Sequence, residues 1–225
     1  RVAALGEGVG DVAVGQRVAV QMEDGAYASK VCVPERFCYP VPEGISSVDA
    51  AALVLTYQTA WWAFTDRAQL VPGESVLVLG AGGGIGVAAI GLAKALGAGA
   101  VIGATRGLGK AAAIRKAGAD QIVDLAQPDL REGLRNDIRR ATGGKGVDVV
   151  IDAVGGAATD AALRAMASTA LSSRACPAPF TTRAEVSLPE DEMVNDRMAV
   201  PSMPLPRAAA GYFLAARSLA RTLLL

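Results

Sequence analysis

Three glycines at intervals of three residues, Gly80, Gly83 and Gly86, separate an apolar run from a helical pattern. The run Val76–Leu79 predicts a buried strand, and the pattern that continues to Lys94 predicts a helix. Glycines allow a sharp turn and a close backbone approach, while a helix start offers free N–H groups and the positive end of its dipole. The order of strand, turn and helix therefore predicts a phosphate site, although a glycine run alone is also compatible with a flexible loop.

Cationic side chains follow the next predicted strand. In dinucleotide-binding folds, a residue about 20 positions after the glycines contacts the adenosine ribose. Here that position is Arg106, which follows Thr105 and precedes Lys110. An acid would bind the 2′-hydroxyl of NAD, whereas a cation pairs with the 2′-phosphate of NADP. No acid occurs between Glu74 and Asp120, which favours NADP(H) over the alternative that these cations are merely solvated surface.

Composition excludes several kinds of chemistry. The 225 residues carry 22 basic and 22 acidic side chains, which gives no electrostatic argument for nucleic acid or an anionic membrane as partner. Without histidine, a histidine-ligated metal, a Ser-His-Asp triad and a histidine general base are excluded from this chain. Three cysteines do not make a four-cysteine zinc site, and no nucleophile stands beside a base, so the catalytic residues are unknown.

The first 43 residues predict a small amount of all-β structure. The segment Asp11–Val20 predicts a turn and a short strand, and Gly25–Pro34 predicts another strand ended by proline. After a linker at Pro40–Gly44, Ser46 and Asp49 form the N-terminal box of a helix. No signal peptide or membrane span is expected, so the predicted location is cytoplasmic.

Strands alternate with helices after the glycine turn. Further strands are predicted at 100–104, 121–125 and 146–152, with helices at 108–117 and 130–142. This alternation indicates right-handed βαβ units, and therefore an α/β fold with a doubly wound parallel sheet.

The C-terminal quarter has a different composition. Only Gly211 of the 26 glycines lies beyond Gly156, and no strand is predicted after Ile151. Beyond Met166 no clear period is present, except for a helical pattern at 207–225. The abrupt loss of glycine indicates either a frame change or truncation in the coding sequence, or a genuine tail.

The glycine turn belongs to a longer pattern, Gly73-Glu74-x-x-Leu77-x-x-x-Ala81-Gly82-Gly83-Gly84-x-Gly86-x-x-x-x-Gly91-x-x-Lys94. With the flanking segments Leu55–Ala60 and Gly144–Gly156, it resembles the zinc-independent quinone oxidoreductases, the ζ-crystallin-like branch of the medium-chain dehydrogenase/reductase superfamily. Gly91 stands where that family has glutamine. The resemblance implies a doubly wound parallel Rossmann sheet with part of a GroES-like β domain.

The resemblance also implies the roles of individual residues. Thr59 would approach the nicotinamide, the glycine turn would line the pyrophosphate, and the two cations would hold the 2′-phosphate. Leu125 replaces a tyrosine that stacks near the adenine in the family. The implied cofactor-binding set is Thr59, Gly82, Gly83, Gly84, Ile85, Thr105, Arg106, Lys110, Val154 and Gly155, with no metal.

Three domains are expected from the resemblance: a partial GroES-like catalytic domain at 1–52, an incomplete NADP-binding Rossmann domain at 53–170, and an atypical tail at 171–225. Family members begin earlier and continue with further Rossmann strands, one of which pairs in a homodimer. The chain is therefore expected to lack an N-terminal part and the recognisable dimer strand.

The implied function is that of an enzyme: NADPH-dependent reduction of a small-molecule quinone or α,β-unsaturated carbonyl by metal-free hydride transfer. An enoyl-thioester reductase is a close alternative. A non-catalytic nucleotide-binding remnant is another, because a truncated chain has an incomplete substrate pocket. Zinc-dependent alcohol dehydrogenase is disfavoured by the lack of histidine.

Overall fold

The computed structural model of the chain describes residues 1–167 and 185–187. The described residues fall into two units, one of residues 1–58 and one that begins at Thr59. The boundary between the units lies inside the first long helix, whereas the sequence placed a domain boundary after residue 52. The expected tail at 171–225 lies outside the described residues except for 185–187, and so does its helical pattern at 207–225.

In the first unit, β1 (Val18–Val20) and β2 (Cys38–Pro40) form a two-stranded antiparallel sheet. A 3-10 turn, η1 (Glu35–Phe37), leads into β2. The predicted strand at 25–34 is wrong, since this segment is an irregular and mostly exposed loop. All three residues of β1 pair with β2, and the described residues contain no third strand in this sheet. The segment 25–34 therefore has no neighbouring strand with which to form backbone hydrogen bonds, although its sequence alternates.

Helix α1 (Ser47–Trp62) begins at the predicted N-terminal box. The Ser46 hydroxyl accepts a hydrogen bond from the Asp49 backbone N–H at 3.1 Å and donates one to the Asp49 carboxylate at 2.6 Å. This pair satisfies a free N–H group of the first turn and confirms the predicted helix start. A π-helical segment, η2 (Ala63–Arg67), directly follows α1.

Within the described residues, the second unit contains a five-stranded sheet with strand order β5-β4-β3-β6-β7 and every pair parallel. The chain winds outward from β3 in one direction through β4 and β5, and in the other through β6 and β7. This confirms the predicted doubly wound Rossmann sheet. The strands are β3 (Ser75–Leu79), β4 (Ala100–Thr105), β5 (Gln121–Asp124), β6 (Val149–Asp152) and β7 (Glu185–Ser187).

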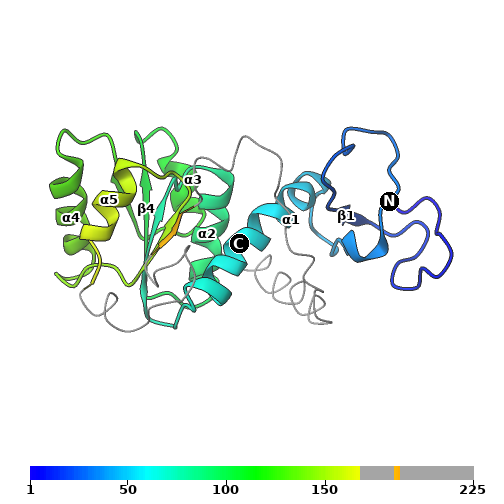
Figure 1. The fold of residues 1–225 in the computed structure, drawn as a ribbon, viewed down its shortest axis with the longest axis horizontal. Helices are drawn as coiled ribbons and strands as arrows, with labels where there is room; N and C mark the ends of the chain where they lie inside the picture. Colours follow the sequence, from blue (N-terminus) through cyan, green and yellow to red (C-terminus); the bar gives the residue numbers. More distant parts are fainter. Residues whose placement is uncertain (168–184, 188–225) are drawn as a thin grey trace. The chain divides into compact units, whose positions relative to one another are not determined.

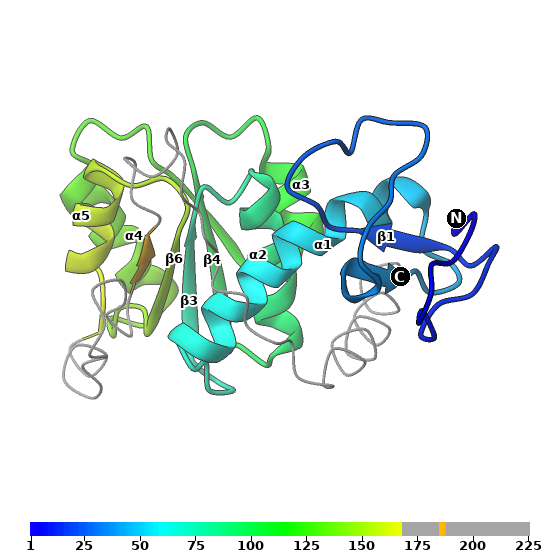
Figure 2. The same cartoon turned by 45° about the vertical axis from the view of Figure 1, so that its right-hand side comes forward.

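Helices cover both faces of this sheet. Figures 1 and 2 show α2 and α3 on one face and α4 and α5 on the other. Their bounds are α2 (Gly84–Ala95), α3 (Ala111–Lys116), α4 (Leu130–Ala141) and α5 (Ala157–Arg164). Helix α3 starts later than the predicted residue 108, because residues 108–111 form a turn in which the Ala111 N–H donates to the Leu108 carbonyl at 2.9 Å.

Strand β7 corrects the expectation that no strand follows Ile151. It pairs with β6 through Val150–Glu185, Ile151–Val186 and Asp152–Ser187, inside the segment expected to be an atypical tail. Three residues without a glycine boundary give too short a pattern for sequence periodicity to detect. The predicted loss of the next Rossmann strand is therefore wrong for this position, while the homodimer stays a prediction.

The sheet is buried on both sides. Side chains alternate along β3, so that Leu77 and Leu79 lie in one core cluster with Leu134 and Ile138 of α4, and Val76 and Val78 point to the opposite face of the sheet, which α2 covers. Every residue of β3 is buried. A strand covered on both faces reads as a continuous apolar run, which explains why the sequence identified it readily.

Candidate functional site

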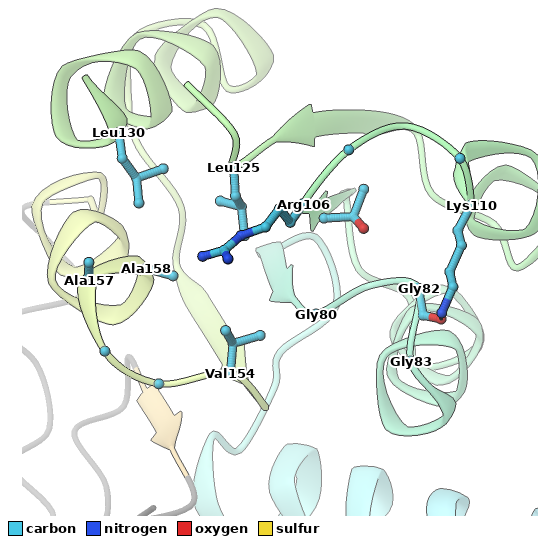
Figure 3. A pocket seen from close by; sticks show the side chains of 15 residues that line it. Gly80, Gly82, Gly83, Arg106, Lys110, Leu125, Leu130, Val154, Ala157 and Ala158 are labelled. Atoms are coloured by element: carbon cyan, nitrogen blue, oxygen red, sulfur yellow. The ribbon is translucent and has the colours of Figure 1, made fainter. Parts of the chain in front are cut away.

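A cleft of about 760 Å³ opens at the carboxyl ends of the strands (Figure 3). Loops that follow β3, β4, β5 and β6 line it, together with the first turns of α4 and α5. The chain winds in opposite directions from β3 and β6, and ligands of open α/β sheets bind outside such a switch point. The lining residues are Gly80, Gly82, Gly83, Thr105, Arg106, Gly107, Gly109, Lys110, Leu125, Leu130, Val154, Gly155, Gly156, Ala157 and Ala158.

The glycine turn, residues 80–83, connects β3 to α2 by close backbone contacts. The Gly83 N–H donates to the Gly80 carbonyl at 2.9 Å, and Gly80 has a φ of 69°. A Cβ on Gly86 would lie 2.8 Å from the Ala81 Cα and would also overlap the Gly80 carbonyl oxygen. The first turn of α2 thus packs directly on the turn, and this contact requires the third glycine of the spacing.

The start of α2 is free of competing groups. Gly83 is the N-cap residue, no side chain caps the helix, and its first turn holds no acid. The first N–H groups of a helix have no partner within it, and the helix dipole is positive at this end. The turn and helix start together can therefore bind the diphosphate of a dinucleotide.

The cation loop, residues 106–110, faces the cleft from the end of β4. Arg106 is exposed, and its guanidinium extends into the cleft towards Leu125 (Figure 3). It makes no hydrogen bond or ion pair within the part of the chain that the structure describes. A guanidinium left free at the end of this strand matches a 2′-phosphate in charge and geometry.

Lys110, at the other end of the cation loop, is already engaged. Its Nζ donates a hydrogen bond to the Gly82 carbonyl at 3.2 Å. The two predicted cations therefore differ in the structure, since one projects into the cleft and the other contacts the glycine turn.

Asp124, at the end of β5, holds the backbone of the cation loop and was missed from the sequence. Its Oδ1 accepts hydrogen bonds from the N–H groups of Ala126 and Gly107, both at 2.8 Å. These two bonds lower the pKa of the Asp124 carboxyl below its ordinary value. Asp124 lies just beyond the acid-free stretch of sequence, so only the fold shows that a carboxylate supports this loop.

Asp152 shapes the loop on the opposite side of the cleft. This buried residue ends β6, and its Oδ1 accepts from the N–H groups of Val154 at 2.8 Å and Gly155 at 3.0 Å. Its Oδ2 accepts a hydrogen bond from the Thr159 hydroxyl of α5. The predicted ribose contacts, Val154 and Gly155, therefore lie on a loop whose backbone N–H groups are hydrogen-bonded to the buried Asp152 carboxylate.

Apolar side chains make the wall beside Arg106. Leu125 follows β5 and Leu130 begins α4, and both line the cleft together with Ala157 and Ala158. Leu125 stands where the resemblance implied the loss of an aromatic contact, yet it still offers apolar surface. The sequence could have indicated Leu130, Ala157 and Ala158. They begin helices that follow predicted strands, and the ends of parallel strands lie at the same edge of the sheet.

The cleft brings together most of the predicted cofactor-binding residues. Those that line it are Gly82, Gly83, Thr105, Arg106, Lys110, Val154 and Gly155. Gly84 and Ile85 are the first residues of α2, directly after the glycine turn, and Thr59 lies on α1; none of these three is among the lining residues. Their contacts with a cofactor stay predictions.

A metal site does not fit the described residues. No group of three or more histidine, cysteine, aspartate or glutamate side chains is close enough to hold an ion in residues 1–167 and 185–187. Within the same part of the chain, no helix has the length and apolar character needed to cross a membrane.

Three comparisons with known proteins agree with this geometry. The family described as zinc-binding dehydrogenase matches residues 84–171. A mycocerosic acid synthase-like polyketide synthase of Mycobacterium tuberculosis is 38% identical over 167 residues, which is 74% of this chain and 8% of the synthase.

Solved structures are similar over more of their own length. A probable oxidoreductase from Mycobacterium abscessus has a TM-score of 0.71 and 32% identity, covering 99% of this chain and 65% of that one. Escherichia coli quinone oxidoreductase complexed with NADPH has a TM-score of 0.64 and 34% identity, covering 73% and 49%. The chain thus spans less than two thirds of these relatives.

The strand order, the glycine turn and the cleft at the switch point define a Rossmann nucleotide-binding unit. The matching family and the oxidoreductase structures narrow this class further. The chain is similar to the zinc-binding dehydrogenase family over residues 84–171, and to solved oxidoreductase structures over a larger part of its length.

Proposed function

We propose that the cleft binds NADPH and that the chain serves the reduction of a quinone or an α,β-unsaturated carbonyl. The observation that carries the proposal is Arg106, a free guanidinium in a cleft that also contains a glycine turn and an uncapped helix start. The similarity to a quinone oxidoreductase complexed with NADPH supports it.

Each part of the cofactor has residues suited to it in this proposal. The glycine turn and the start of α2 take the diphosphate, and Arg106 takes the 2′-phosphate. Leu125 and Leu130 give the adenine an apolar contact. Val154 and Gly155 lie beside the nicotinamide ribose, and Thr59 approaches the nicotinamide.

The chemistry is a hydride transfer. When bound, NADPH would supply the hydride, and solvent the proton, for a two-electron reduction of the acceptor. The chain contributes orientation and charge, since a shaped binding site is what such a cofactor requires from its protein. The described residues do not fit zinc, so no step is assigned to it.

Reduction of an enoyl thioester is a second candidate. The match to a segment that makes up 8% of a mycocerosic acid synthase-like polyketide synthase supports it. The chemistry differs only in the carbonyl that accepts the electrons. A nucleotide-binding protein without turnover is the third candidate, because the chain spans only part of its relatives.

Turnover separates these candidates. The purified chain is incubated with NADPH and, in turn, an ortho-quinone, a simple enone and an enoyl thioester, while loss of reduced nicotinamide absorbance is recorded. We expect consumption with the quinone or the enone and slower consumption with NADH. Consumption with the thioester alone selects the second candidate, and tight NADPH binding without any turnover selects the third. Absence of binding contradicts the proposal altogether.

A further inference from the structure

A second cavity, of about 410 Å³, lies at α4 and α5, which are side by side on one face of the sheet (Figures 1 and 2). The described residues that line this arginine pocket are Arg131, Glu132, Arg135 and Arg164. None of them lines the cleft at the carboxyl ends of the strands. The arginine pocket is therefore a separate candidate site, and the proposed function makes no use of it.

The arginine pocket has more positive charge than the described residues neutralise. Its three guanidinium groups and one carboxylate give a formal charge of +2. Arg131, Arg135 and Arg164 form no ion pair with any carboxylate of the described residues, although Glu132 lies among them. The pocket therefore suits an anionic ligand.

Two of these arginines stand where α4 gains no stability from a cation. Arg131 lies in the first turn of the helix and Arg135 lies four residues further, on the same side. A cation is unfavourable at the positive end of a helix dipole, and like charges four positions apart repel each other. Arg139 and Arg140 lie in the last turn, where the dipole favours cations. Helix stability thus explains the second pair of arginines but not the first.

The Arg135 Nε–H group is the most specific feature of the pocket. Its nitrogen is buried and has no hydrogen-bond partner in the part of the chain that the structure describes. Buried donors in folded proteins are nearly always paired. A guanidinium binds an oxyanion through two parallel N–H groups, so an oxyanion in the pocket would give this donor an acceptor.

We infer that the arginine pocket binds a phosphate group, either as inorganic phosphate or as the monoester of a small molecule. A phosphate monoester carries a charge of about −1.5 to −2 near neutral pH, which matches the formal charge of the pocket, and it offers three acceptor oxygens. A single carboxylate offers less charge and only two oxygens. The inference does not depend on nucleotide binding in the cleft, because the two sites share no lining residue.

Nuclear magnetic resonance of the arginine Nε–H groups tests this inference on the 225-residue chain. The chain is titrated with glycerol phosphate and, separately, with inorganic phosphate. Because the cleft also suits phosphate, binding is followed at the Arg135 signal and not by total heat. We expect this signal to shift and its exchange with water to slow, since the buried donor gains an acceptor.

Variants on both helices locate the site. Arg164→Gln removes the guanidinium that α5 contributes, and the dissociation constant should rise about tenfold or more because a charge-assisted hydrogen bond is lost. Arg131→Gln repeats the test from α4, so that the result does not depend on the folding of one variant. Arg139→Gln is the matched control, since it removes the same charge from an exposed position of α4 outside the pocket, and it should change nothing.

The two probes distinguish the sources of the phosphate. Tighter binding of glycerol phosphate identifies a monoester and tighter binding of inorganic phosphate identifies the free ion, and either result supports the inference. An Arg135 signal that no phosphate probe shifts would overturn it. So would an equal loss of affinity in Arg164→Gln and Arg139→Gln, or an equal shift with sodium chloride at the same ionic strength, because each would reduce binding to unspecific charge.

Discussion

The glycine turn and the cation loop face the same cleft from neighbouring strands, but they use different parts of the chain. The turn presents backbone, and its shape is fixed by backbone contacts such as the Gly83 N–H to the Gly80 carbonyl. The cation loop presents the Arg106 side chain, and its backbone is held from outside by Asp124. Under the proposed function, the turn therefore decides whether a dinucleotide fits, and the cation loop decides which one.

The largest effect is expected from Gly86→Ala, which attacks the turn. The new Cβ would lie 2.8 Å from the Ala81 Cα and 2.9 Å from its carbonyl carbon, and neither backbone atom can move without displacing the turn. Overpacking against fixed atoms costs about 3 kcal/mol, so the free energy of unfolding should fall by that amount. Affinity for NADPH and NADH should disappear together, as measured by chemical denaturation and calorimetry.

A matched control for this change lies in the cation loop. Gly109 has no atom within 4 Å of an added Cβ and does not have a positive φ, so Gly109→Ala adds the same methyl group to open space. Its free energy of unfolding should equal that of the native chain. An equal loss in both variants would show that the contact at Gly86 is not what fixes the turn.

A smaller and more selective effect is expected from Arg106→Ala in the cation loop. Charge-assisted hydrogen bonds contribute roughly 1.5–3 kcal/mol, so the preference for NADPH over NADH should drop about 10- to 100-fold. Because the guanidinium has no partner in the described part of the chain, the unfolding free energy should not change. Arg115→Ala provides the charge-matched control. An equal drop in that variant would show that the preference depends on net positive charge and not on a contact made by Arg106.

The same contrast explains how much the sequence could predict. The turn was predictable because each of its steps is local: an apolar run, three spaced glycines and a helical pattern. Arg106 was found by counting about 20 residues from the last glycine of the turn. Asp124 could not be found in this way, because its bond to Gly107 depends on the pairing of β5 with β4.

Pairing also accounts for the errors in the strands. The segment 25–34 alternates like a strand, but β2 already pairs with β1, and periodicity does not report which segments find partners. Strand β7 shows the reverse, since three residues without a clear pattern pair with β6. Likewise, both Arg106 and Lys110 are visible as cations, but only the fold shows that one of them contacts Gly82.

The smallest effect is expected from the support of the cation loop. The pKa of Asp124 is lowered in the folded chain by the N–H groups of Ala126 and Gly107, so its charged form is favoured by folding. Its contribution to stability is therefore complete above the unfolded pKa, about 4, and is lost as pH falls through the lower folded pKa. Asp124→Asn removes this titration, so the difference in denaturation midpoint between native chain and variant should be constant near neutral pH and shrink below about pH 4. A difference that is the same at every pH would mean that the Asp124 charge does not stabilise the loop, and that the loop, like the turn, depends on backbone contacts alone.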